Sequence, residues 1–437
     1  SDVVFFTDPT LGELEVQRFH NDTLEDEFDN MSLTIEGSIG DLEVVYTGAY
    51  TDRTSDQIID YTDYLFVGQY LPYYICDYYV TYTKYAPGNV PTGACPAPDM
   101  FVDSLTDAKV KTHEIRINAP ISDNMSITAG AFMSDLELKE HAMFTYPGAV
   151  ESDIGWGPNY ALTDTSVAGY QALLDGDGNL KSKQYAADGW HSGRGPYMPP
   201  VMFVNDIKRT DKQKGIFGEL AIDLSDTLEL TVGARWYDIA VDLEGAANAG
   251  FTTGFLGGAE QRDQQRFGTN LSAAFNKPGV VTGNPFIDEL NYPDKAESDG
   301  VIGKATLSWN KSDDVMYYVT WSEGFRPGLL NRPAGQSTPD GSYTVRPVTD
   351  SDEVTNYEFG WKTVLQDGRL RFNGSVFMVD VSGLQTTIFD PSIANLFFSD
   401  NAADADIRGL EGDFVYYPNI DGLMISGAFS LLDTEIK

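Results

Sequence analysis

Apolar and polar residues alternate along this chain in stretches of about ten positions. In the segment 228–237, Leu228, Leu230 and Val232 fall on one face, whereas Glu229 falls on the other. The segments MSITAGAFM and LRFNGSVFM follow the same pattern. A period of two residues predicts β-strands with one apolar and one polar face. No comparable stretch shows the periodicity of a helix.

Very short polar turns join these strands in pairs. Each turn contains Asp, and Asn or Gly often accompanies it. These residues suit tight turns because they tolerate left-handed backbone or hydrogen-bond back to it. The unit of strand, turn and strand occurs six times, centred on 38–44, 120–126, 223–230, 309–317, 364–372 and 417–425.

The connections at the other ends of the strands are long and rich in Gly, Pro, Asp and Tyr. They run roughly over 52–108, 139–212, 242–297 and 324–352. Strict alternation of short turns with long loops is typical of an outer-membrane barrel, with periplasmic turns and extracellular loops. The apolar face would then meet lipid and the polar face the lumen. The alternative is a large soluble β-protein whose apolar faces pack into a core.

The pattern predicts an all-β fold, a transmembrane antiparallel up-and-down β-barrel. We expect about twelve strands in the chain, with bounds accurate to a few residues. The expected strands are 27–38, 42–51, 109–119, 125–138, 213–224, 228–241, 298–309, 314–323, 353–365, 369–388, 394–417 and 422–437.

The charge balance narrows the classes of partner. The chain has 66 acidic residues against 29 Lys plus Arg, a formal net charge of −37. This negative charge argues against nucleic acid or anionic lipid headgroups as the main partner, because the chain would repel both. The longest apolar run, Val315 to Val319, is too short for a transmembrane helix. A barrel strand, in contrast, needs only ~9–11 alternating residues.

The chain has two cysteines, Cys76 and Cys95, in a loop-like stretch. They lack the paired Cys and His ligands of a zinc site. We expect a disulfide between them, which would indicate an oxidising compartment. Free thiols are the alternative.

Five consecutive motifs in the C-terminal third carry a family resemblance. They are YYVTWSEGFRPGLLNR (317–332), VTNYEFGWKT (354–363), LQDGRLRFNGSVFMVDVSGLQ (365–385), NAADADIRGLEGDF (401–414) and GLMISGAFSLLDTEI (422–436). Their order and spacing resemble the barrel domain of TonB-dependent outer-membrane receptors. The resemblance implies a barrel of about twenty-two strands in a Gram-negative outer membrane, with a plug domain in its lumen. Residues 1–437 would then be part of the barrel domain, with the plug and the final strands outside this chain.

The resemblance also implies a function. Such receptors are active transporters that capture a scarce nutrient, such as a siderophore, cobalamin, haem or a saccharide, with extracellular loops. Expected partners are the TonB complex acting through the plug, outer-membrane lipid and lipopolysaccharide, and a small nutrient ligand. Two alternatives are a passive porin-like barrel and a secreted β-rich binding or structural protein. No enzyme signature such as HExxH or a P-loop occurs, and we expect no enzymatic activity.

Several motif residues are expected to be structural. Phe325 is placed for an aromatic belt at the membrane interface, and Arg326 for an ion pair with Glu323 or Glu358. Glu358 should face the polar lumen. We interpret these positions as barrel framework and not as ligand contacts.

Two loop clusters are the candidates for ligand binding. Aromatic rings can stack on sugars or aromatic chelators, although they can equally pack a loop together. One cluster lies in the Tyr-rich tract 61–85 and the other in the longest loop. The candidate residues are Tyr64, Tyr73, Tyr78, Trp190, His191, Arg194 and Tyr197.

One loop segment resembles the opening of an EF-hand. Asp175, Asp177 and Asn179 alternate as calcium ligands do. The sixth position is Leu180 instead of Gly, and the twelfth is Ala186 instead of Glu. A weak Ca²⁺ site is the hypothesis and a solvated turn the alternative. No other cofactor is expected.

Overall fold

The structure is a computed structural model of the whole chain. Its described residues are 12–16, 18–62, 99–145, 147, 192, 201–249, 295–331, 337–338, 340–390, 393 and 397–437. Within this part of the chain, no helix is long and apolar enough to cross a membrane.

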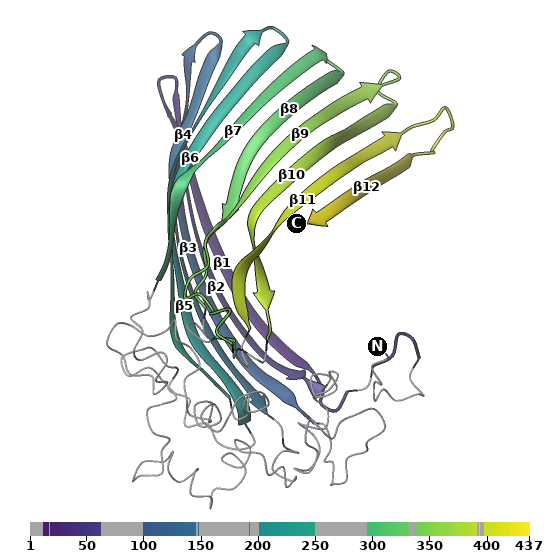
Figure 1. Cartoon of the computed structure of the whole chain (residues 1–437). Coiled ribbons are helices and arrows are strands. Elements are labelled where there is room, and N and C mark those ends of the chain that lie inside the picture. Colours follow the sequence, from purple (N-terminus) through teal and green to yellow (C-terminus); the bar gives the residue numbers. More distant parts are fainter. Residues whose placement is uncertain are drawn as a thin grey trace, which may run out of the picture.

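The described elements form one twelve-stranded sheet in which each strand pairs with its neighbours in sequence. All pairs are antiparallel, and the sheet is strongly curved (Figure 1). The predicted all-β, antiparallel up-and-down fold is therefore confirmed. The strands are β1 (Thr23–Ile39), β2 (Leu42–Asp60), β3 (Phe101–Ser122), β4 (Met125–Thr145), β5 (Val201–Ser225), β6 (Leu228–Ala249), β7 (Lys295–Ser312), β8 (Val315–Arg326), β9 (Asp352–Leu365), β10 (Leu370–Ile388), β11 (Phe398–Tyr416) and β12 (Ile425–Ile436).

The short turns lie together at one end of the sheet (Figure 1). Gly40 occupies the left-handed region in the β1–β2 turn, with a φ of 64°. In the β9–β10 turn, Gln366, Asp367 and Gly368 all have positive φ. Asp and Gly tolerate this conformation, whereas Gln rarely adopts it. At the β3–β4, β5–β6 and β7–β8 turns the register shifts by one residue just before the turn. A bulge of this kind increases the local twist.

Several strands extend well beyond their predicted ends on the side of the long connections. β2 continues to Asp60, and β5 begins at Val201, so parts of the predicted loops 52–108 and 139–212 are strand. In these extensions polar residues occupy both faces, for example in TDRTSDQ of β2. Alternation therefore fails as a signal there, although the cross-strand hydrogen bonds continue.

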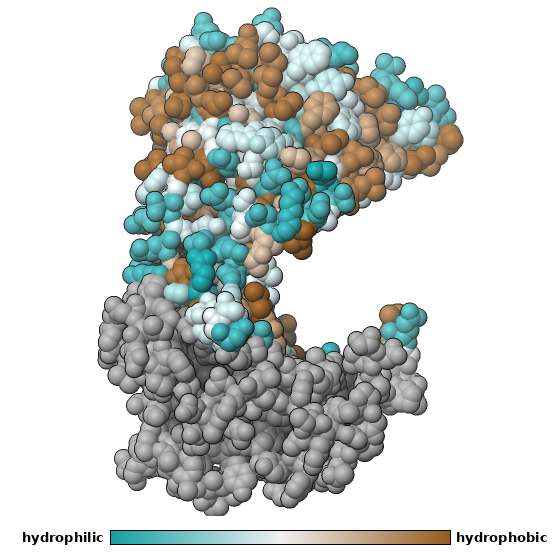
Figure 2. All heavy atoms as spheres, in the orientation of Figure 1, coloured by the Kyte–Doolittle hydropathy of each residue, from teal (hydrophilic) through white to brown (hydrophobic). Residues whose placement is uncertain are grey.

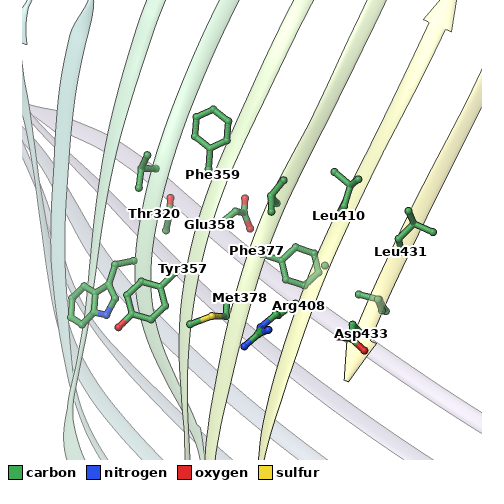
Figure 3. A pocket seen from close by; sticks show the side chains of 15 residues that line it. Thr320, Tyr357, Glu358, Phe359, Phe377, Met378, Arg408, Leu410, Leu431 and Asp433 are labelled. Carbon is green, nitrogen blue, oxygen red and sulfur yellow. The ribbon is translucent and has the colours of Figure 1, made fainter. Parts of the chain in front are cut away.

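The two faces of the sheet differ in polarity and in exposure. We call the face with Val232 and Trp236 of β6 the outer face, and the face with Thr231 and Arg235 the lumen face. Val232 and Trp236 are exposed, whereas Thr231 and Arg235 are half-buried. Figure 2 shows apolar residues gathered toward the short turns and hydrophilic ones toward the long connections. This apolar band is what a lipid-facing surface requires. A shallow groove crosses the outer face over β8–β12 (Figure 3).

Glycines opposite aromatic rings shape the C-terminal strands. A Cβ at Gly409 would lie 2.1 Å from the ring of Phe377, and one at Gly374 would lie 2.3 Å from the ring of Trp361. Each ring therefore lies over a neighbouring backbone that carries no side chain. Such pairs fix the register of β9, β10 and β11 because a one-residue slip would remove the space for the ring.

Candidate functional site: the lumen face and the inner loop

Polar side chains line the lumen face between β8 and β12. Glu358 lies on this face, as predicted, and accepts a hydrogen bond from the hydroxyl of Tyr318. Glu411 accepts one from Ser375 at 3.5 Å. Tyr318, Ser375 and Glu411 border a groove of about 600 Å³. Its other lining residues are Trp361, Lys362, Asn373, Gly374, Gly412, Asp413, Ala428, Phe429 and Ser430.

β8 leaves the wall of the sheet in its second half. Its pairing with β7 stops at Ser322 opposite Lys304, although β8 pairs with β9 as far as Arg326. Beyond this point the backbone N–H of Gly303 donates to Glu323 Oε2 at 2.8 Å in place of a strand partner. The end of β8 is thereby free to turn toward the lumen.

Phe325 shows where the end of β8 goes. Its ring stacks on the ring of Tyr237, a lumen-face residue of β6, with 3.6 Å between ring centroids. The prediction that Phe325 belongs to an aromatic belt facing the membrane is therefore wrong. Alternation placed its side chain outward, but β8 has moved inside the wall formed by β6 and β7. Its outward side consequently packs against their lumen face.

The connection from β8 to β9 continues this inward course. We call it the inner loop; its described residues are 327–331, 337–338 and 340–351. Leu330 is buried in a cluster with Tyr237, Ile239, Val241 and Ala296, against which Val348 also packs. These partners lie on the lumen face of β6 and β7. Burial of apolar side chains on both sides therefore seats the inner loop on the inside of the wall.

Hydrogen bonds to β7 tie both ends of the inner loop to the wall. The backbone N–H of Gly328 donates to Ser298 Oγ at 3.2 Å, and the hydroxyl of Ser351 donates to the same atom at 3.0 Å. Within the loop, Thr349 N–H donates to the carbonyl of Leu329 at 2.9 Å. One serine of the wall thus accepts hydrogen bonds from the second residue of the loop and from its last residue.

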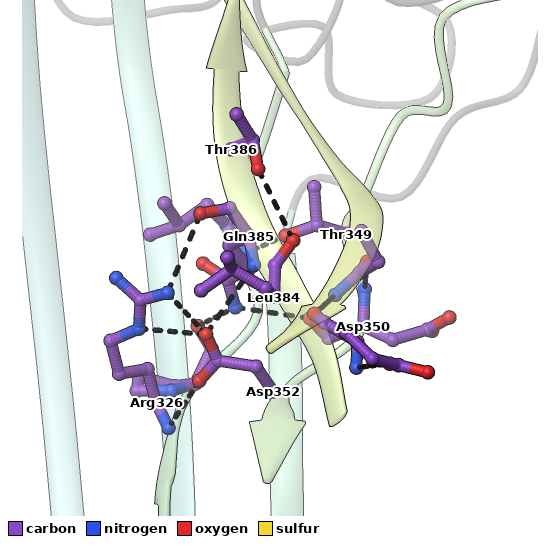
Figure 4. A network of polar contacts seen from close by, with 12 residues as sticks. Arg326, Thr349, Asp350, Asp352, Leu384, Gln385 and Thr386 are labelled. Atoms are coloured by element: carbon purple, nitrogen blue, oxygen red, sulfur yellow. Dashed lines mark hydrogen bonds and ion pairs between the residues drawn. The ribbon is translucent and has the colours of Figure 1, made fainter. Parts of the chain in front are cut away.

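Three amide side chains join the inner loop to β10 and β11, and Figure 4 shows that of Gln385. Gln385 Nε2 donates to the carbonyls of Pro327 and Asp350 at 2.9 and 3.0 Å. Asn401 accepts from Asp350 N–H at 2.8 Å and donates back to its carbonyl. Asn331 exchanges two hydrogen bonds with the backbone of Ser399, each 2.8 Å long. An amide suits this role because it both donates and accepts.

An ion pair closes the base of the inner loop. The guanidinium of Arg326 donates from Nε to Asp352 Oδ2 at 2.8 Å, and the backbone N–H of Arg326 donates to Oδ1 at 3.0 Å. The predicted partners, Glu323 and Glu358, are therefore wrong. Register is the reason, because Arg326 lies directly opposite Asp352 in the β8–β9 pair. Its role as framework agrees with the prediction.

The tip of the inner loop is polar. Hydrogen bonds from Thr338 and Ser342 lower the pKa of the Asp340 carboxyl to about 2. The hydroxyl of Tyr343 donates to Asp400 Oδ2 of β11 at 2.7 Å. Burial, followed by this hydrogen bond, holds the pKa of Tyr343 well above its usual range. At neutral pH the Asp340 carboxylate is therefore charged and the Tyr343 phenol neutral.

The site residues predicted from sequence lie outside the described residues. This holds for the seven ligand candidates (Tyr64, Tyr73, Tyr78, Trp190, His191, Arg194 and Tyr197), for the Ca²⁺ candidates (Asp175, Asp177 and Asn179), and for Cys76 and Cys95. The predicted disulfide and calcium site stay predictions. Elsewhere, the described ranges contain no group of three or more His, Cys, Asp or Glu that could hold a metal ion.

Ser192, the neighbour of His191, is described and lies against β5. Its backbone N–H and its hydroxyl donate to Asp206 Oδ2 at 3.2 and 3.0 Å. The other oxygen of this buried carboxylate lies 3.4 Å from His141 Nδ1. The hydroxyl bonds to the acid and not to the imidazole, so the three residues lack the order of a catalytic triad. They fix residue 192 to the long-connection end of the sheet.

The curved up-and-down sheet, with an apolar outer face and a polar lumen face, has the architecture of an outer-membrane β-barrel. The family model described as TonB dependent receptor-like, beta-barrel matches residues 16–437. The chain belongs to this family. It is therefore a β-barrel protein of a Gram-negative outer membrane. The family predicted from the five C-terminal motifs is confirmed.

Solved structures with the same fold cover almost all of the chain. The ferric yersiniabactin uptake receptor FyuA from Yersinia pestis has a TM-score of 0.54 at 11% identity, over 95% of this chain and 43% of its own. The siderophore receptor PiuA from Acinetobacter baumannii has a TM-score of 0.52 at 14% identity, over 95% of this chain and 47% of its own. The FrpB iron transporter (F5-1 variant) from Neisseria meningitidis has a TM-score of 0.50 at 12% identity, over 94% of this chain and 45% of its own. The chain spans less than half the length of these proteins. At such identities the likeness establishes the fold alone.

Sequence reasoning missed the residues that hold the inner loop. Asn331 and Asn401 lie in motifs that carry the family resemblance, but alternation gives them no role. Asp352 and Gln385 become recognisable only once the strand register is known. The sequence signal for these residues was a polar side chain near the end of a strand. That signal does not identify the residue to which the side chain bonds.

Proposed function

We propose that this protein is an active transporter that captures a scarce nutrient at the long-connection end and imports it with energy transmitted by TonB. Membership in the family supports nutrient uptake across the outer membrane. The observation that carries the proposal is the inner loop, which is seated on the lumen face by Leu330 and by Ser298. An element fixed inside the wall narrows the lumen, and membership in the family favours a gated receptor over an open porin.

The proposed substrate class is a metal chelate of the siderophore type. The three structures above are described as a ferric yersiniabactin uptake receptor, a siderophore receptor and an iron transporter. Cobalamin, haem and saccharides are the other nutrient classes. An acidic surface repels an anionic chelate, but screening limits that repulsion beyond ~8–10 Å.

The proposed ligand contacts are the aromatic and polar residues of the two loop clusters, Tyr64, Tyr73, Tyr78, Trp190, His191, Arg194 and Tyr197. Deletion of 61–85, of 188–198, or of both tests this proposal. The expected result is loss of ligand affinity and uptake while heat-modifiable migration in detergent gels, which reports a folded barrel, is retained. Unchanged affinity and uptake in the double deletion would contradict it.

A plug domain and the TonB complex are the proposed partners for energy coupling. Support comes from the family and from the polar lumen face, which offers Glu358 and Glu411 to a domain filling the lumen. The test is crosslinking in cells between this barrel and a TonB protein. Crosslinks that increase when ligand is added support the proposal, and their absence with and without ligand contradicts it.

Two smaller proposals concern the loops. A disulfide between Cys76 and Cys95 is tested by peptide mapping without reduction, in which two free thiols would contradict it. A weak Ca²⁺ site at Asp175, Asp177 and Asn179 is tested by isothermal titration and by melting with a chelator. The calcium site would be contradicted if titration gave no heat of binding and the chelator did not shift the melting temperature.

A further inference from the structure

One stretch of β7 has a strand partner on one side only. β7 pairs with β6 over residues 295–309 but with β8 only over 304–312. Residues 295–303, which we call the open edge, therefore have no partner among the described strands on the side that β8 has left (Figure 1). A free strand edge is a template for another extended chain, because it presents unpaired N–H and C=O groups.

Every second residue of the open edge points its backbone groups toward the opening. In an antiparallel ladder the N–H and C=O of one residue point to the same side, and those of the next residue point to the other. Gly303 donates its N–H to Glu323 of β8, so the odd-numbered residues point toward the opening. These are Val301, Asp299 and Glu297, all of which are exposed. On that side, none of their backbone groups bonds to another residue of the described ranges.

The open edge begins where the apolar band of the outer face ends. Val301 lies opposite Trp236, and both are exposed apolar residues. The next outer-face pair toward the long connections is Asp299 with Asp238. Unpaired backbone groups are strongly destabilising in hydrocarbon, whereas water satisfies them outside it. The edge from Asp299 onward is therefore available to a partner outside the membrane.

β8 itself cannot cover the open edge beyond Gly300. If the register of the β7–β8 pair continued, Arg326 would lie opposite Gly300 and Pro327 opposite Asp299. Proline has no N–H to donate, and it interrupts a ladder. A strand partner for Asp299 and Glu297 therefore has to come from another segment or another molecule.

The charge beside the open edge is mainly negative. Glu297 and Asp299 lie on the outer face of β7, and Glu323 lies across the opening. All three are exposed and form no ion pair within the described part of the chain, and Lys295 is the cation at the far end of the edge. Opposite charges on directly opposite residues stabilise a strand pair. Because Glu297 and Asp299 are two residues apart, they select a strand with basic side chains at the same spacing.

We propose that the open edge binds an extended peptide with basic side chains at alternating positions, as an added antiparallel β-strand. Main-chain hydrogen bonds to Glu297, Asp299 and Val301 supply the pairing. Contacts of the basic side chains with the two carboxylates supply the selectivity. The inference goes beyond nutrient uptake and shares with the proposed function only the placement of the long connections outside the cell.

Fluorescence anisotropy of labelled peptides, with the protein extracted from outer membranes in detergent, tests the proposal. The probes are a peptide of alternating Lys and Thr, a peptide of alternating Glu and Thr, and the first peptide methylated at each Lys backbone nitrogen. Methylation keeps the charge but removes the N–H groups that would face β7. The unmethylated Lys–Thr peptide should bind at least about tenfold tighter than either of the others. Equal binding of the methylated peptide, or a protein dimer that excludes the peptide, would overturn the proposal.

Three variants locate the site. The double variant Glu297→Gln, Asp299→Asn should weaken binding of the Lys–Thr peptide about fivefold, because it removes both opposite charges. Val301→Pro should also weaken binding, since it removes an N–H that points toward the opening and leaves the pairing with β6 intact. The matched control is Asp135→Asn, an exposed outer-face acid on β4, which is paired on both sides. This control should leave binding unchanged.

Heat-modifiable migration verifies that each variant is folded. Equal losses in the double variant and in Asp135→Asn would overturn the proposal, because the effect would then reflect the overall charge of the protein. The peptide comparison needs no variant, so it stands even where a variant does not fold. The measurement involves peptide and no nutrient. A negative result therefore leaves the uptake proposal standing, and a failure of uptake leaves the open edge standing.

Discussion

Arg326 and Asp352 form an ion pair in which one partner is exposed and the other is buried. The Arg326 side chain is 56% exposed, whereas the Asp352 side chain is 1% exposed. The carboxylate also accepts a hydrogen bond from the backbone N–H of Arg326 and lies at the base of the inner loop. Loss of Arg326 and loss of Asp352 therefore have different consequences. Only the loss of Arg326 leaves a buried charge, the Asp352 carboxylate, without its counter-charge.

Substitution of Arg326 tests this asymmetry. Arg326→Gln should lower the free energy of unfolding by about 3 kcal/mol, since it leaves the Asp352 carboxylate without its counter-charge. Asp352→Asn should cost less, because it leaves no buried charge. Urea unfolding in detergent, followed by tryptophan fluorescence, measures both. The control Arg346→Gln, in an exposed pair, should cost no more than about 1 kcal/mol. Equal effects of the three variants would contradict the assignment.

The seat of the inner loop is tested by a designed crosslink. Ser298 Oγ and Ser351 Oγ are 3.0 Å apart, so cysteines at both positions should form a disulfide in the folded protein. Thiol labelling before and after reduction, followed by mass spectrometry, measures its formation. The two single-cysteine variants control for Cys76 and Cys95. Freely labelled thiols at both positions in the folded double variant would show that the loop is not on the lumen face.

Glycine substitutions test the packing of rings over bare backbone. Gly409→Ala forces the ring of Phe377 to move and should lower the free energy of unfolding by about 1–3 kcal/mol. A Cβ added at Gly37 would meet no atom within 4 Å, and the φ of Gly37 is not positive. Gly37→Ala should therefore stabilise β1 by about 0.5–1 kcal/mol. Urea unfolding distinguishes the two, and changes of the same sign would refute the packing argument.

The pKa of Asp340 predicts the pH response of the loop tip. Its folded pKa of about 2 is lower than the usual ~3.9, so the charged carboxylate stabilises the turn. That contribution is complete above about pH 4 and is lost as the pH falls toward 2. Carboxyl ¹³C NMR difference spectra against Asp340→Asn measure the midpoint. A midpoint near 4 would mean that Thr338 and Ser342 do not hold the carboxylate.

The sequence predicted the strands better than the packing inside them. Alternation in 228–237 located β6 and its two faces, because lipid and lumen impose opposite polarities on neighbouring residues. It failed beyond Thr51 of β2, where polar side chains occupy both faces and the polarity no longer alternates. It also misplaced Phe325, because alternation assigns a face relative to the strand and cannot show that the strand itself moves inward.

The sequence pattern did not predict the position of the inner loop, for a related reason. Its attachments join residues far apart in sequence, such as Asn331 with Ser399 and Gln385 with Pro327. These contacts depend on the register of three strand pairs, which the sequence pattern does not determine. The motifs nevertheless indicated the family, since SEGFRPG and NYEFGWKT border this same loop.

We propose that the barrel imports its ligand actively. The decisive measurement is the rate of uptake of a labelled ferric siderophore by cells producing the protein, with and without a functional TonB, over a range of ligand concentrations. We predict saturable uptake that disappears when TonB is removed while surface binding remains. Uptake that rises linearly with concentration and persists without TonB would contradict the account and indicate a passive pore.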